Sequence, residues 1–446
     1  MIVLQRLNRA LKSAFAIGAL IMCSLSARAG SYIIDRDSFS EHIILSATSY
    51  SFTDGDITWI YRNFKKGSRY EGEWFNGVVL VEMRGLVEGE LAIPGTTPDG
   101  RPVTALGSGL FSGNVDIDSV VIPDSVEMLF PGVFYGCEYL KEIALPDSIN
   151  EISHSIFSGC SRLEKVKLGV NIPNISHRMF RGCSSLETIE WNGTESLKII
   201  GSQAFQGCVD LRELALPDSV TNLYEEAFYG CTGITNIQVG ANMRTVGARA
   251  FYDNSSLLEI NFNGNKVREI GGSCFSGCTV LRHFKMPDSV REVGTYLLSG
   301  CERLLSVQIG DSLELISEGF CMGCESLTNI VWGSSVETLG YRAFRGCVSL
   351  QGELQIPDTV ETIGSYLFSG CSGLRHVKIG TGCTSILDLA FMGCEHLLAV
   401  EAAGEVEQIG DSVFSGCKNL TNITIPRTVT AIGGRAFDDC ISLTAI

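Results

Sequence analysis

One short phrase recurs along most of this chain: an aromatic residue, usually Phe, then two residues ending in Gly, then Cys, as at 134–137 and 414–417. The last residue of the phrase falls on fifteen positions between 114 and 440, and eleven of the fourteen intervals are 23 residues, two are 24 and one is 25. Self-similarity at a fixed period of about 20–50 residues is the signature of stacked repeats. The sequence therefore predicts a repeat solenoid of fifteen rungs.

Each unit contains an alternating apolar stretch and a turn. In residues 134–157, Ile143 and Leu145 alternate as in a strand, and Pro-Asp-Ser follows at 146–148. Proline closes such a strand because it removes a donor from the ladder. Since no unit can bury its own hydrophobic face, each must stack on its neighbours. We therefore expect a β-strand in every unit of about 23 residues.

The repeat resembles that of the BspA-like (treponemal-type) leucine-rich repeat proteins. The matching features are the Leu-x-x-Ile-x-Ile/Leu-Pro strand, the Val-x-x-Ile-Gly segment at 360–364 and the Ala-Phe-x-x-Cys phrase at 343–347, within residues 86–446. The resemblance implies a curved leucine-rich repeat solenoid, with a strand and a turn or short helical segment in each unit. It also implies a secreted or surface-displayed protein used for adhesion, although a family of this kind indicates fold better than function.

Residues 1–29 have the pattern of a secretory signal peptide. Three basic residues precede an apolar run at 14–25, and Ala-Arg-Ala at 27–29 predicts cleavage after Ala29. An uncleaved anchor is the alternative, but the run is shorter than the about 20 residues that a span needs. A lipoprotein would use Cys23, which follows a large Met where a small residue is expected. We expect export to the surface, the envelope or the medium, with no transmembrane span in the mature chain.

The two ends of the repeat raise separate questions. Residues 30–85 lie outside it and are rich in aromatic residues, so we expect a strand-rich N-terminal cap over the first rung, with an independent binding domain as the alternative. Residues 86–446 are then the solenoid. The sequence stops at Ile446 within a strand, which predicts an open edge. End-to-end self-association, cover by a partner and a shortened gene are the alternatives there.

Seventeen cysteines in an exported protein would ordinarily indicate disulfides. Thirteen of them, an odd number, share one repeat position, and asparagine fills it in the other two rungs. Equivalent Cβ atoms on stacked strands lie about 4.8 Å apart, whereas a disulfide needs about 3.8 Å. We therefore predict a buried ladder of free thiols, each side chain donating to a backbone carbonyl, with a few bridges or a metal as alternatives. The ladder comprises Cys137, Cys160, Cys183, Cys208, Cys231, Cys278, Cys301, Cys324, Cys347, Cys371, Cys394, Cys417, Cys440, Asn114 and Asn254.

The sequence offers little for catalysis. It has no nucleophile elbow, phosphate-binding glycine loop or paired-histidine zinc motif, and four of its six histidines follow the repeat. Asp124 with Asp147, and Asp288 with Asp311, lie on neighbouring rungs and are calcium candidates. Turn formation explains these aspartates better. We expect no enzyme activity, cofactor or metal, and the formal net charge of -16 argues against nucleic acid.

We expect binding on the strand face that points away from the core, to which each rung supplies two side chains. Trp191, Phe262 and Trp332 fall in the inward phase, so this face is polar and without aromatic residues. Such a face favours a protein ligand over a sugar, and a merely solvated face is the alternative. The candidate ligand face comprises Lys165, Lys167, His283, Lys285, His376 and Lys378.

Two departures from the regular spacing stand out. The unit after Cys183 has two extra residues, and the unit after Cys347 has one extra residue inside the strand, at 351–357. The second insertion predicts a β-bulge. The sequence assigns a function to neither insertion.

Three classes of function follow from these observations. The first is adhesion or protein-ligand binding through the solenoid face, with a protein of a host or of another cell as partner. The second is a scaffold of the cell envelope that assembles through the C-terminal edge. The third is an enzyme, and no sequence feature favours it.

Overall fold

The computed structural model describes residues 33–34, 43–66, 74–191, 193, 195–264, 266–403 and 405–444. The predicted signal peptide, Cys23 and Ile446 lie outside these ranges. The chain divides into two compact units, Met1–Leu197 and Lys198–Ile446. Among the described residues, no helix has the length and apolar character needed to cross a membrane.

The first unit opens with an antiparallel meander. Its strands are β1 (Ile33–Ile34), β2 (Ile43–Asp54), β3 (Ile57–Lys66) and β4 (Trp74–Arg84). β4 then pairs in parallel with β6 (Val103–Leu106). The ring of Trp59 is buried and meets Phe111 edge-on, at a centroid distance of 6.3 Å. Trp59, from the segment before the repeat, thus packs against the first phenyl ring of the repeat.

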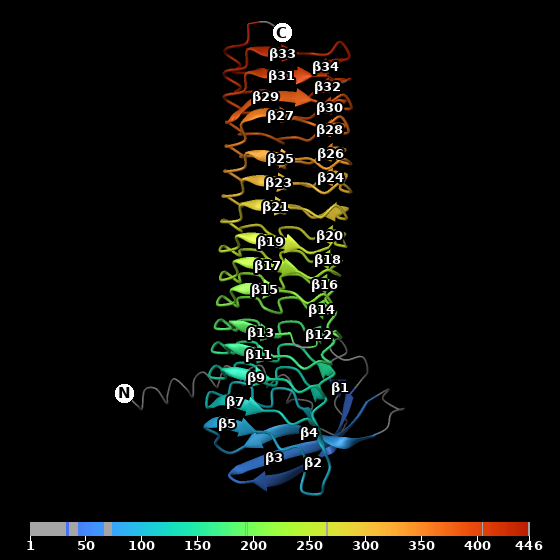
Figure 1. Ribbon diagram of the computed structural model, residues 1–446, viewed down its shortest axis with the longest axis vertical. Helices are drawn as coiled ribbons and strands as arrows, with labels where there is room; N and C mark the ends of the chain where they lie inside the picture. The colour runs from blue at the N-terminus through green and yellow to red at the C-terminus, as the bar shows by residue number, and fades with distance from the viewer. Residues whose placement is uncertain are drawn as a thin grey trace, which may run out of the picture. The chain divides into compact units, whose positions relative to one another are not determined.

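The rest of the first unit is a stack of parallel rungs (Figure 1). Its two ladders contain β5 (Gly89–Ala92), β7 (Ile117–Val121), β9 (Glu142–Ala144), β11 (Lys165–Lys167) and β13 (Thr188–Glu190), and then β6, β8 (Met128–Leu129) and β10 (Glu151–Ile152), with β12 (Asn174–Ile175) also in this unit. Lys165 pairs in register with Glu142, the residue at the same place in the preceding repeat unit. The sequence period is therefore the rung-to-rung step.

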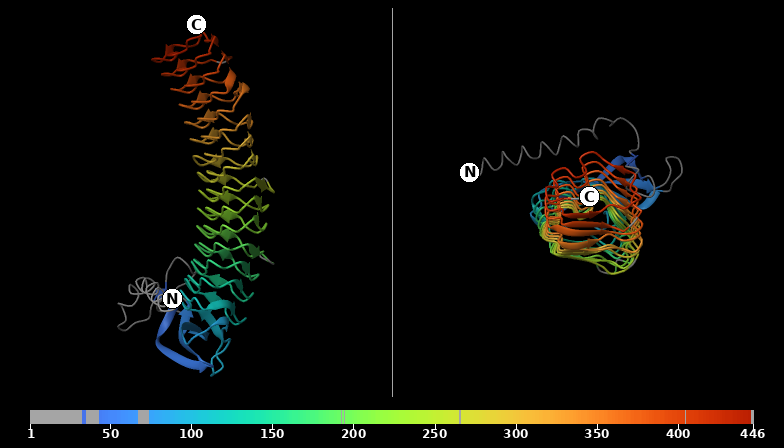
Figure 2. Two further views of the ribbon diagram at one scale, coloured as in Figure 1. Left: turned by 90° about the vertical axis from the view of Figure 1, so that its left-hand side faces the viewer. Right: turned by 90° about the horizontal axis from the view of Figure 1, so that it is seen from above.

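The second unit repeats this path from one rung to the next (Figure 2). One side carries three separate parallel sheets: β15 (Glu213–Ala215), β17 (Asn236–Val239) and β19 (Glu259–Phe262); β21 (His283–Lys285), β23 (Ser306–Gln308) and β25 (Asn329–Val331); and β27 (Gly352–Gln355), β29 (Leu374–Ile379), β31 (Ala399–Ala402) and β33 (Asn422–Thr424).

The other side of the second unit carries two-residue strands. They are β14 (Ile199–Ile200), β16 (Asn222–Leu223), β18 (Thr245–Val246), β20 (Glu269–Ile270) and β22 (Glu292–Val293), followed by β24 (Leu315–Ile316), β26 (Thr338–Leu339), β28 (Thr362–Ile363), β30 (Ser385–Ile386), β32 (Gln408–Ile409) and β34 (Ala431–Ile432).

The Pro-Asp turns tie successive rungs together. The Asp147 carboxylate accepts from the backbone N–H of Val170 at 3.0 Å, and Asp358 accepts from Thr381 at 2.8 Å. Each of these donors lies 23 residues after its acceptor, on the next rung. These contacts give Asp147 and Asp358 a structural role between rungs.

The third side of each rung is a turn rather than the short helical segment that the resemblance also allowed. Left-handed backbone recurs in it, as at Glu226 with φ 58° and Gly230 with φ 65°. The phenyl rings beneath this turn stack face to face: Phe228 lies 4.9 Å from Phe205 and 5.5 Å from Phe251 between centroids. A continuous aromatic column therefore fills the core behind the turns of these rungs.

Candidate functional site

The repeated cysteines lie behind the turns, where their thiols serve the fold. The Sγ of Cys301 donates to the carbonyl oxygen of Phe275 at 3.2 Å, and Cys394 donates likewise to Phe368 at 3.3 Å. All cysteines of the described ranges are unbridged. Burial raises the pKa of Cys137 and of Cys278 to about 12. Thiols that stay protonated are poor nucleophiles and metal ligands, so we place no chemistry in this column.

The two asparagines of the column behave differently from the cysteines. The Oδ1 of Asn114 accepts from the backbone N–H groups of Asp116 and Ile117, at 2.9 and 3.0 Å. Asn254 is fully buried, and neither of its amide atoms has a hydrogen-bond partner. The predicted donation to a carbonyl is therefore wrong for Asn254, and Asn114 is instead an acceptor at the first rung. An unpaired buried amide carries a desolvation cost, so Asn254 is a weak point of the column.

The structure spreads the candidate ligand face over several sheets. In the first unit, Lys165 and Lys167 extend from β11, and the ammonium of Lys165 meets the Glu190 carboxylate at 2.6 Å. This hydrogen bond raises the pKa of Lys165 and lowers that of Glu190. Lys165 is therefore partly neutralised by its neighbour.

In the second unit, the four remaining candidates occupy two different sheets. His283 and Lys285 lie on β21, where Nδ1 of His283 is 2.8 Å from Oγ of Ser306. His376 and Lys378 lie on β29, and Lys378 forms an ion pair with Glu353 at 2.8 Å. β21 and β29 belong to separate sheets, so the structure does not gather these four side chains into one site.

Between those sheets the strand face is interrupted. β25 ends one parallel sheet and β27 begins the next, and these two described strands are not paired. The insertion predicted as a β-bulge lies here, and the register of β27 against β29 shifts between Gly352 and Glu353. The residue left unpaired at this shift is Arg375 of β29, so the irregularity is at the predicted place but on the facing strand. Gly352 adopts φ 85°, a left-handed conformation that favours glycine. The insertion therefore coincides with the break in the strand face.

A cleft of about 390 Å³ lies at this break. Trp332 lines it half-buried, donates its indole N–H to the carbonyl of Gln355 at 2.8 Å, and meets Phe344 edge-on at 5.7 Å. The inward placement predicted for Trp332 is thus only partly correct, since its ring also closes the gap between two sheets. Beside it, Val331 is 45% exposed. The cleft is lined by Thr328, Asn329, Ile330, Trp332, Leu350, Gln351, Glu353, Leu354, Gln355 and Pro357.

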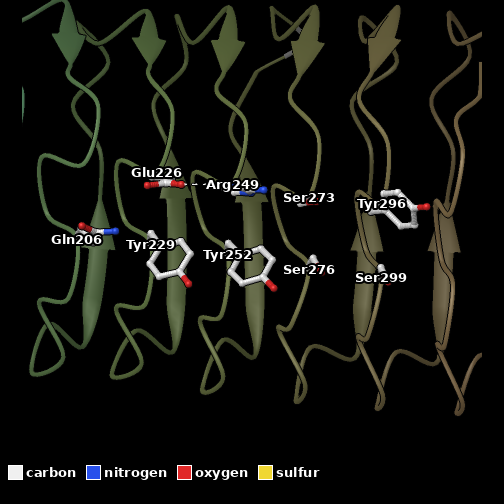
Figure 3. Close-up of a pocket in the computed structure, with 9 residues that line it drawn as sticks. All are labelled: Gln206, Glu226, Tyr229, Arg249, Tyr252, Ser273, Ser276, Tyr296 and Ser299. Atoms are coloured by element: carbon white, nitrogen blue, oxygen red, sulfur yellow. Dashed lines mark hydrogen bonds and ion pairs between the residues drawn. The ribbon is translucent and has the colours of Figure 1, made fainter.

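A second groove, of about 520 Å³, lies on the turn side of the second unit (Figure 3). Tyr229 and Tyr252 stack in parallel at 5.2 Å, and Arg249 pairs with Glu226 at 3.4 Å. Beyond Tyr252 the lining continues with Ser273, Ser276, Tyr296 and Ser299 (Figure 3). Sequence reasoning missed this groove because it considered the strand face alone. Its two tyrosine rings stack on each other, and Arg249 is paired with Glu226. Because these groups already have partners, we rank this groove below the Trp332 cleft.

Comparisons with known proteins bear on the whole repeat. A family model described as the BspA type leucine rich repeat region matches residues 104–231, 198–322 and 314–444. A leucine-rich repeat protein from Bacteroides ovatus is 24% identical, over 88% of this chain and 93% of that chain, and its crystal structure superposes with a TM-score of 0.60. That likeness shows a shared fold.

A leucine-rich cell surface protein from Faecalibacterium prausnitzii is 23% identical, over 85% of this chain and 96% of that chain, with a TM-score of 0.37. None of the curated proteins is a match.

Proposed function

This chain belongs to the BspA-type leucine-rich repeat family, and we propose that it is an exported repeat protein that adheres to other cells by binding a protein ligand. The secretory pattern of residues 1–29 supports export. The repeats supply a rigid, extended set of in-register side chains of the kind that solenoids use for binding. The observation that carries the proposal is the Trp332 cleft at the break in the strand face.

The cleft has the anatomy of a protein-binding hot spot. Trp is among the residues that dominate binding energy at interfaces, and such anchors sit in packed pockets surrounded by polar groups. Trp332 is held in place by Gln355 and Phe344, so little side-chain entropy is lost when a partner covers it. Next to the cleft, the Lys378–Glu353 ion pair provides a polar rim. The hydrogen bond with Glu353 raises the pKa of Lys378 above its ordinary value.

We expect Trp332→Ala to weaken adhesion strongly. Beads coated with the protein are incubated with cultured epithelial cells or other bacterial cells, and the bound beads are counted against protein density. Loss of one hot-spot side chain costs about 2 kcal/mol or more, which is about 30-fold in affinity. Trp191→Ala is the matched control, because Trp191 follows β13 as Trp332 follows β25.

The proposal also predicts that protease treatment of the target cells abolishes binding by the unaltered protein. Equal losses in both tryptophan variants would contradict the assignment to the cleft. Adhesion that survives proteolysis of the target cells would contradict a protein ligand. Absence of adhesion to any cell would favour the envelope scaffold.

A further inference from the structure

Three arginines occupy one position of the repeat on consecutive rungs of the second unit. Arg268 donates its backbone N–H to the carbonyl of Arg244 at 2.8 Å, and Arg291 donates to Arg268 at 2.9 Å. Their Cα atoms therefore follow the rung spacing of about 4.8 Å. The row lies immediately before β18, β20 and β22, away from the Trp332 cleft in sequence. Further along the chain, Glu337 donates to Glu314 in the same way, so the row of arginines is local.

The row lines a groove of about 500 Å³ with one further cation. The lining residues are Arg244, Lys266, Arg268, Ser289, Arg291 and Ser312. All four cationic residues are exposed. In the part of the chain that the structure describes, no ion pair involves any of them; Lys266 instead donates to the side-chain oxygen of Asn242.

Such a row does not serve stability. Unit charges of like sign at the rung spacing of about 4.8 Å repel by about 0.9 kcal/mol even in water. The protein carries a formal net charge of -16, so acidic residues are plentiful, yet none pairs with this row in the described residues. An anion that bridges the guanidinium groups would relieve the repulsion. The arrangement is that of an anion-binding site.

We propose that this groove binds a sulfated polysaccharide, in addition to the protein ligand of the strand face. Guanidinium groups bind tetrahedral oxyanions through paired N–H donors, and the repeat along the groove suits a chain that carries regularly placed anions. Clusters of Lys and Arg are known to bind heparin and nucleic acid alike. The groove has no aromatic side chain on which bases could stack, and no apolar side chain to receive a peptide. The hydroxyls of Ser289 and Ser312 suit a hydrophilic chain.

The test is binding of a fluorescent heparin oligosaccharide to the full chain, measured by polarisation over a range of salt concentrations. We expect the triple substitution Arg244→Gln, Arg268→Gln and Arg291→Gln to weaken binding about tenfold or more. The slope of log affinity against log salt should also fall by about three, one for each cation removed. The same oligosaccharide without its sulfate groups should not bind.

The control triple is Arg282→Gln, Arg303→Gln and Arg345→Gln, which changes net charge equally at exposed positions outside the groove. Equal weakening in both triples, or equal binding of the desulfated chain, would overturn the proposal. Tighter binding of single-stranded DNA with the same dependence on the three arginines would assign the groove to nucleic acid instead.

The thermal unfolding midpoint of the Gln triple should equal or exceed that of the unaltered protein, because repulsion is removed. The corresponding triple lysine variant should keep the salt slope and lose affinity.

Discussion

Phe228→Ala is expected to lower the free energy of unfolding of the second unit by about 3–5 kcal/mol. The Phe228 ring is fully buried and lies between the rings of Phe205 and Phe251, at centroid distances of 4.9 and 5.5 Å. Its removal leaves a cavity that the stacked rungs cannot close, because the backbone spacing is fixed by the parallel ladders on either side. Urea denaturation followed by circular dichroism measures the effect.

Tyr224→Ala is the control for this substitution. Tyr224 is 47% exposed and precedes the same turn, so its truncation should change the free energy of unfolding by less than about 1 kcal/mol. Each rung contacts only its neighbours, so the loss in Phe228→Ala should also appear as faster hydrogen exchange in the adjoining rungs. A loss below about 1 kcal/mol for Phe228→Ala would show that the aromatic column is not the main support of these rungs.

The second large effect is expected at alkaline pH. Burial raises the pKa of Cys137, Cys278 and Cys417 from 9.0 to about 12 in the folded chain. Between those values the unfolded thiol loses its proton and the folded thiol keeps it. The stabilising contribution is therefore complete below about pH 9 and is lost as the pH rises toward 12. In that window each such thiol lowers the free energy of unfolding by up to about 1.4 kcal/mol per pH unit.

The measurement is urea denaturation at pH 8, 9 and 10 in the presence of a reductant. We expect the free energy of unfolding to fall steeply above pH 9, since several buried thiols contribute together. Tyrosine and lysine also titrate at high pH, so the variants Cys278→Ala and Cys417→Ala provide the control. Each variant should make the fall of the free energy of unfolding with pH less steep, by the contribution of one thiol. A free energy that is constant from pH 8 to pH 10 would contradict buried, reduced thiols.

The rungs could be predicted from the sequence because one phrase repeats with almost constant spacing. A residue such as Ile143 alternates with exposed neighbours, and the structure has that alternation in β9. The turn could not be distinguished from a short helical segment, because the phrase fixes its apolar contacts but not its backbone angles. The left-handed residue there is Glu226 in one rung and Arg249 in the next, so no single residue type marks it.

The cleft and the arginine row were not predicted, for a different reason. Both depend on which residues of different rungs become neighbours. Trp332 has the same place in its rung as Trp191, and it lines a cleft where β25 and β27 are not paired. The extra residue in residues 351–357 is the available sequence signal, and the sequence alone assigns it no function. Arg244 and Arg268 belong to different repeat units and meet only after the rungs are aligned.

The most direct test of the proposed function places a photo-crosslinking amino acid at position 331, beside the cleft, and irradiates the protein on intact target cells. The matched position is Leu315, which is 51% exposed on β24 of the other side of the rungs. We predict one predominant crosslinked protein at position 331, absent at position 315 and lost when Trp332→Ala is added. No protein adduct at position 331, or the same set of adducts at both positions, would contradict protein binding at the strand face.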